Sequence, residues 1–136
     1  MYLKNIRFKA VAAGMIIDIA GSIAVGFAIV IYIAVVASNS GDTSLAHFTI
    51  LKDNVYLRLL GLLGTIFFTG LGGYVAARLS RPNGLCNSLA VGLLGILLGT
   101  VLFISMPGIA PKWKFTLGVI LTIPAALIGG RIATRS

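Results

Sequence analysis

Four apolar stretches, each long enough to cross a lipid bilayer, constrain the fold of this 136-residue chain more than any other feature. They cover residues 10–37, 59–77, 85–106 and 115–132. A helix of about 20 apolar residues crosses the hydrocarbon core of a bilayer. No stretch alternates polar and apolar residues as the strands of a membrane barrel do. The sequence therefore predicts an all-α, polytopic membrane domain built as a four-helix bundle.

The composition excludes an ordinary soluble domain. Hydrophobic residues make up 58% of the chain and charged residues only 10%, whereas soluble domains have about 25% charged residues. The net charge is +8, but the basic residues lie at the ends of apolar stretches, which favours anionic lipid as their partner and not nucleic acid. The single cysteine and single histidine leave no disulfide and no multi-histidine metal site within one chain.

The basic residues are distributed unevenly between the two sides of the predicted bundle. With four spans both termini lie on one side, and that side carries seven basic residues and no acidic residue. These are Lys4, Arg7, Lys9, Arg78, Arg81, Arg131 and Arg135. The other side carries four basic and two acidic residues. Because cytoplasmic loops are enriched in lysine and arginine, we expect both termini in the cytoplasm.

The longest connection joins the first two spans. Within it, apolar residues recur every three or four positions, at Leu45, Phe48, Leu51 and Val55. This period is typical of a short amphipathic helix on the membrane surface, and it predicts such a helix at about residues 44–55.

An internal repeat relates the two halves of the chain. The pattern Gly-Gly-x-x-Ala-x-Arg ends the second span at residues 72–78 and the fourth at 129–135. The first and third spans each carry a pair of glycines separated by six residues, Gly14 with Gly21 and Gly92 with Gly99. The repeat predicts two duplicated helical hairpins of the same orientation, related by an axis along the membrane normal.

Small residues lie on one face of each predicted helix. The chain has 17 glycines, most of them within the spans. Small residues allow helices to approach closely in a membrane, where lipid provides no hydrophobic drive for association. These faces either pack against each other within the bundle or bind a second protein or a second copy. The glycines concerned are Gly14, Gly21, Gly72, Gly73, Gly92, Gly95, Gly99, Gly129 and Gly130.

Asp18 is the only charged residue in the first span. A carboxylate in hydrocarbon costs a few kcal/mol on insertion scales, so it needs a partner, water or a proton. Its spacing from Gly14 and Gly21 places it on the packing face. Three interpretations remain open: a structural contact, a contact with a basic group of a partner protein, or a proton or cation site. The structural contact would be an ion pair with Arg78, Arg131 or Arg135, or hydrogen bonds from Ser22 or Asn87.

Residues 72–80 read Gly-Gly-Tyr-Val-Ala-Ala-Arg-Leu-Ser, followed by Pro-Asn-Gly-Leu at 82–85 and Ala-Val-Gly-Leu-Leu-Gly at 90–95. This segment resembles small, uncharacterised bacterial membrane proteins with four spans and a Gly-Gly-Tyr-x-Ala-Ala-Arg-Leu turn. The resemblance implies a multi-pass protein of the bacterial inner membrane and carries no activity.

The residues of a catalytic site are missing from the sequence. There is no Ser-His-Asp set, no paired carboxylates and no phosphate-binding glycine loop, so we expect neither an enzyme nor a cofactor. The leading hypothesis is a membrane protein that binds another membrane protein, as an accessory subunit or a toxin-immunity protein. The alternative is a homo-oligomeric carrier or channel that uses Asp18 as a proton or cation site, with Pro124 kinking the fourth span.

Overall fold

The structure is a computed structural model that describes residues 6–39, 41, 49, 53–80, 83–106 and 111–135. Within these residues the chain forms four α-helices, all long and apolar enough to cross a membrane. They are α1 (Phe8–Asn39), α3 (Val55–Leu79), α4 (Gly84–Ser105) and α5 (Lys112–Arg135). The prediction of an all-α, four-span bundle is confirmed. The predicted surface helix at residues 44–55 falls largely outside the described residues.

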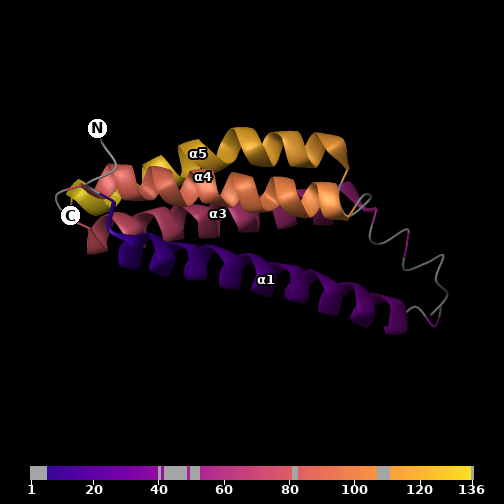
Figure 1. Cartoon of the computed structure of the whole chain (residues 1–136). Helices are drawn as coiled ribbons and strands as arrows, with labels where there is room; N and C mark the ends of the chain where they lie inside the picture. Colours follow the sequence, from indigo (N-terminus) through magenta and orange to yellow (C-terminus); the bar gives the residue numbers. More distant parts are fainter. Residues whose placement is uncertain are drawn as a thin grey trace.

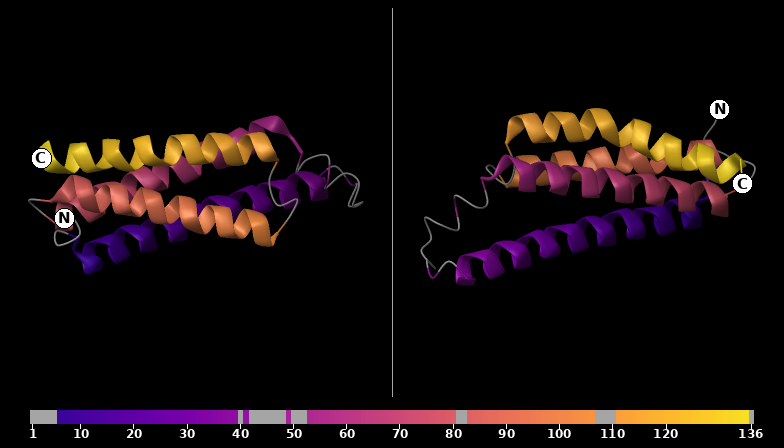
Figure 2. Two further views of the ribbon diagram at one scale, coloured as in Figure 1. Left: turned by 45° about the horizontal axis from the view of Figure 1, so that its top comes forward. Right: turned by 180° about the vertical axis from the view of Figure 1, so that it is seen from behind.

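The four helices alternate in direction, so that α1 begins and α5 ends at the same end of the bundle (Figure 1). We call this the terminal end, and the end where α3 and α5 begin the far end. The central helix is α3, which packs along both α1 and α5 and also contacts α4. Toward the far end α1 diverges from α4 (Figures 1 and 2). Its contact with α3 runs along the middle of both helices, where Val25 lies over Gly64 and Ile29 over Gly61. Nearer the far end α1 separates from α3 as well (Figures 1 and 2).

Glycines let the backbones of neighbouring helices touch. A Cβ atom added to Gly14 of α1 would lie 2.5 Å from the carbonyl oxygen of Gly72 in α3, and one added to Gly72 would lie 2.6 Å from that of Gly14. Between α3 and α5, a Cβ at Gly129 would collide with the carbonyl oxygen of Gly70. Such close approach brings many atoms into dispersion contact, which is the main attraction between helices in lipid.

Most of the predicted small-residue faces are used inside the chain. The glycines at seven of the nine predicted positions are buried: Gly14, Gly21, Gly72, Gly73, Gly92, Gly129 and Gly130. Gly95 and Gly99 of α4 are only partly buried, and no atom lies within 4 Å of the position that a Cβ of Gly99 would take. Of the nine predicted glycines, the two that remain partly open to other contacts therefore both lie on α4.

The two hairpins do not pack in equivalent ways, although each carries the Gly-Gly motif. Gly72 contacts Gly14 of its own hairpin, whereas Gly129, its counterpart in the repeat, contacts Gly70 of the other hairpin. Duplication of the hairpin therefore remains a prediction. The helix α5 continues through Pro124 and bends along its length (Figure 2), as expected where proline removes a backbone hydrogen bond.

Candidate functional site

The carboxyl group of Asp18 lies inside the bundle, among α1, α3 and α4. Asp18 as a whole is only 7% exposed. The Thr69 hydroxyl of α3 donates a hydrogen bond to its Oδ1 at 2.7 Å. Its Oδ2 faces Gly95 of α4 and lies 3.4 Å from the position that a Cβ of Gly95 would occupy. The carboxyl group therefore lies between Thr69 of α3 and Gly95 of α4.

No described basic residue neutralises this carboxyl group. The ion pair formed among the described residues joins Arg58 and Asp53, far along the chain from Asp18. Arg78, which was expected as a partner, is exposed and donates to the Tyr74 hydroxyl at 3.0 Å. Arg131 and Arg135 are exposed in the last turn and a half of α5. The structure thus does not bring the predicted arginine partners to Asp18.

The two predicted polar partners also lie elsewhere. Asn87 is fully buried, but its Oδ1 accepts a hydrogen bond from the Arg7 backbone at 2.8 Å, and its Nδ2 donates to the Asn83 carbonyl at 2.9 Å. Asn87 therefore ties the chain before α1 to the start of α4. Ser22 is half-buried one turn beyond Asp18 and makes no hydrogen bond to its carboxyl group.

Sequence reasoning missed Thr69 as the partner of Asp18. A signal was present, because Thr65 and Thr69 lie four residues apart on the face of α3 that also carries Gly72. Residues three and four apart on a helix share one face. A hydroxyl on a packing face in an apolar stretch is a natural partner for a buried carboxyl group.

The Thr69 hydroxyl has two acceptors within reach but only one proton. Its Oγ1 lies 2.7 Å from Asp18 Oδ1 and 3.0 Å from the carbonyl oxygen of Thr65. A protonated Asp18 can donate to Thr69, whose own proton then goes to Thr65, so both contacts are hydrogen bonds. An ionised Asp18 can only accept the hydrogen bond of the Thr69 hydroxyl, so no proton remains for the contact with Thr65. It also leaves a negative charge in the bundle without a counter-charge. The geometry thus favours a carboxyl group that carries a proton.

The second carboxyl oxygen of Asp18 retains exposed surface. Within the described part of the chain, every fully buried side-chain oxygen or nitrogen has a hydrogen-bond partner. Oδ2 of Asp18 has none and therefore is not fully enclosed. It lies on the side of Gly95, a residue that also lines a cavity between α3, α4 and α5.

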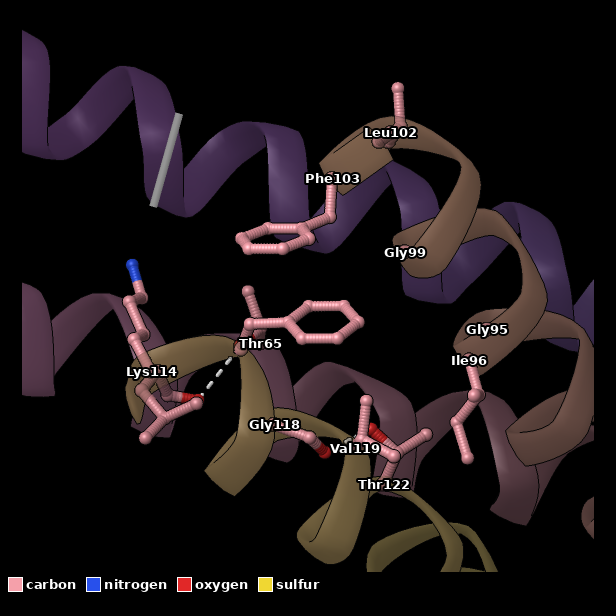
Figure 3. Close-up of a pocket in the computed structure, with 12 residues that line it drawn as sticks. Thr65, Gly95, Ile96, Gly99, Leu102, Phe103, Lys114, Gly118, Val119 and Thr122 are labelled. Carbon is pink, nitrogen blue, oxygen red and sulfur yellow. Dashed lines mark hydrogen bonds between the residues drawn. The ribbon is translucent and has the colours of Figure 1, made fainter. Parts of the chain in front are cut away.

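This cavity has a volume of about 360 Å³. The lining side chains extend along one stretch of the bundle (Figure 3). They are Leu62 and Thr65 of α3, Gly95, Ile96, Gly99, Leu102 and Phe103 of α4, and Lys114, Phe115, Gly118, Val119 and Thr122 of α5. The hydroxyls of Thr65 and Thr122 donate to carbonyls of their own helices, at 2.8 and 2.6 Å. Lys114 is therefore the one charged group on an otherwise apolar wall.

No family model, curated protein or solved structure matches this chain. Of the resemblance carried by residues 72–95, the structure supports the four-span architecture. The function must accordingly be argued from Asp18, its contacts and the adjacent cavity. On the arrangement of its four long apolar helices, the chain is an integral membrane protein with four spans.

Proposed function

We propose that the protein is a small, non-enzymatic membrane carrier in which Asp18 takes up and releases a proton. The observation that carries this proposal is a buried carboxyl group without a counter-charge, with one oxygen bonded to Thr69 and the other beside Gly95 without a hydrogen bond. Ionisable groups inside membrane domains are costly and typically mark proton or substrate pathways. A cation other than a proton fits less well, because one carboxyl group and one hydroxyl supply too few oxygens.

The packing around Asp18 supports a change of shape when the proton leaves. Thr69 of α3 and Gly95 of α4 lie beside its carboxyl group, Gly72 of α3 lies against its Cβ, and none of the three carries a charge. Loss of the proton would place an unpaired charge in this contact, which would favour entry of water between α1 and α4. The contact of α1 with α4 is less extensive than its contact with α3. We propose that this weaker contact opens, while α1 remains on α3.

The charge distribution supports a proposed orientation of the protein in the membrane. We place both termini in the cytoplasm of a bacterial inner membrane, because the terminal end has the excess of basic residues. The cavity and Lys114 would then lie in the outer half of the bilayer. Self-association of the carrier belongs to the proposal.

Proton flux into liposomes tests the proposal. With the purified protein in liposomes that contain a pH-sensitive dye, an imposed membrane potential should drive acidification. Asp18→Asn should fold normally, since the amide can still bond to Thr69, and should reduce the flux to that of empty liposomes. Asp53→Asn changes an exposed carboxylate and is the matched control, which should leave the flux unchanged. Flux that persists in Asp18→Asn would refute the assigned role of Asp18.

A second candidate function is binding of another membrane protein, as an accessory subunit or a toxin-immunity protein. It is supported by a stripe of small residues on α1, at Ala20, Ala24 and Ala28, all of which are exposed. Spaced four apart, they lie on one face and would admit a close-packed partner helix.

The native mass of the protein extracted from its own membranes in nanodiscs tests this second function. A stoichiometric foreign subunit that is lost in Ala24→Phe would support it, because the larger side chain would block the stripe. The control is Leu60→Phe on α3, where the side chain is exposed and already large. A pure homo-oligomer in both variants would contradict partner binding and agree with the carrier.

A further inference from the structure

The cavity between α3, α4 and α5 has the size and the wall of a ligand site. Its volume of about 360 Å³ lies within the range of about 300–1,000 Å³ typical of small-molecule pockets. It exists because Gly95 and Gly99 of α4 have no side chains and α5 adds Gly118. The aromatic rings of Phe103 and Phe115 stack at 4.3 Å between centroids and form one wall between α4 and α5.

The cavity opens on the surface that faces the lipid. Leu102 lines it and is nevertheless 51% exposed, so the rim lies on the outside of the bundle. The wall is apolar, because the hydroxyls of Thr65 and Thr122 are turned to their own helix backbones (Figure 3). An apolar hollow is a poor place for water and gains dispersion contacts when a hydrocarbon chain fills it.

A positive charge without an acidic partner lies at the far-end rim of this cavity. Lys114 is half-buried in the first turn of α5, beside Trp113, a residue type enriched where a membrane meets water. Its Nζ lies over Gly61, 3.5 Å from the position that a Cβ would take there. No described acidic residue pairs with it. Asp53 is paired with Arg58 instead.

We infer that this cavity binds one acyl chain of an anionic phospholipid from the surrounding bilayer, with the phosphate held by Lys114. The charge at the rim complements a phosphate, and the apolar hollow next to it complements the chain attached to that phosphate. The position of Lys114 at the end of a membrane-spanning helix places it at the level of lipid head groups. This inference goes beyond the proposed carrier function and does not require Asp18 to exchange a proton.

The charge at the rim is tested by competition between two lipids. The full-length protein is equilibrated with equal amounts of phosphatidylglycerol and phosphatidylcholine of identical acyl chains, and retained lipid is counted by native mass spectrometry. We expect preferential retention of phosphatidylglycerol, reduced about fivefold by Lys114→Gln, since one lysine is worth about 1 kcal/mol toward anionic lipid. Lys112→Gln is the matched control, because Lys112 is exposed on the same turn and does not line the cavity.

The cavity itself is tested by filling it. Gly99→Leu places a side chain in the open space of the cavity and should abolish lipid retention. Gly26→Leu is the control, because Gly26 on α1 has equally open surroundings but does not line the cavity. Circular dichroism and thermal unfolding verify that both variants fold. If Gly99→Leu does not fold, the comparison of Lys114→Gln with Lys112→Gln still tests whether the cavity binds an anionic lipid.

Several results would overturn the inference. In the competition experiment these are equal retention of the two lipids by the wild type, or equal effects of Lys114→Gln and Lys112→Gln. Retention of lipid by a folded Gly99→Leu variant would also overturn it, as would a preference of the wild type for a fatty acid over phosphatidylglycerol. Asp18→Asn should retain lipid as the wild type does. The lipid site and the proton site can therefore fail separately.

Discussion

Replacing Gly129 by alanine is expected to destabilise the bundle more than alanine at any other glycine of the helices. The added Cβ would collide with the carbonyl oxygen of Gly70, which belongs to the backbone of α3 and cannot turn aside as a side chain can. Overpacking of a core costs typically 1–3 kcal/mol and occasionally more. Because relief here requires α5 to move away from α3, we expect the upper end of that range. Thermal unfolding and gel-filtration profiles in mild detergent measure the effect.

Gly118→Ala supplies the matched control on the same helix. A Cβ at Gly118 would meet only the Leu62 side chain, at 3.8 Å, which is an ordinary contact. This variant should be as stable as the wild type, or slightly more stable because alanine favours helix. If Gly129→Ala proved as stable as Gly118→Ala, the close backbone contact between α3 and α5 would be refuted.

Thr69→Val is expected to destabilise the protein by about 1–2 kcal/mol, because it leaves a buried carboxyl group without its hydrogen bond. The same change made in an Asp18→Leu background should cost much less, since no carboxyl group then needs a partner. This double-mutant cycle isolates the contact between the two side chains. Unfolding in mixed micelles gives the free energies of the four proteins.

Thr65→Val is the control for this cycle. The Thr65 hydroxyl donates to the Leu62 carbonyl of its own helix at 2.8 Å and makes no contact with Asp18. Its replacement should cost the same with and without the Asp18 carboxyl group. An equal cost of Thr69→Val in both backgrounds would show that the bond between Thr69 and Asp18 contributes nothing to stability.

The bundle could be predicted from the sequence because the length and apolar character of a segment decide whether it crosses a membrane. Glycine spacing likewise indicated which faces pack. The inward position of Asp18 followed from its place beside Gly14 and Gly21 on one helix face. These are properties of single helices, which a sequence shows directly.

The partner of Asp18 was not predictable in the same way, because it depends on how two helices are set against each other. The contact of Gly14 with Gly72 fixes that register and brings Thr69 opposite Asp18. The expected arginines lie too close to the membrane surface. Asp18 is ten residues into α1, about 15 Å from its start, whereas Arg78 lies in the last turn of α3. Long basic side chains there extend toward water.

The cavity was equally beyond sequence reasoning. Gly95 and Gly99 were identified as small residues for packing, yet no helix fills the space beside Gly99. The space depends on how α3, α4 and α5 are set against one another, which is a property of the whole bundle. Lys114 appeared in the sequence only as part of a basic cluster near a span end. Only the fold shows that none of the described acidic residues pairs with Lys114.

Infrared difference spectroscopy of the purified protein in lipid tests the central claim most directly. A protonated carboxyl group has a C=O stretching band that an ionised carboxylate lacks. The account predicts such a band for the wild type, its disappearance on titration with base, its loss in Asp18→Asn and its retention in Asp53→Asn. A carboxylate spectrum at every pH, or a band that survives Asp18→Asn, would contradict the claim that Asp18 holds an exchangeable proton in the bundle.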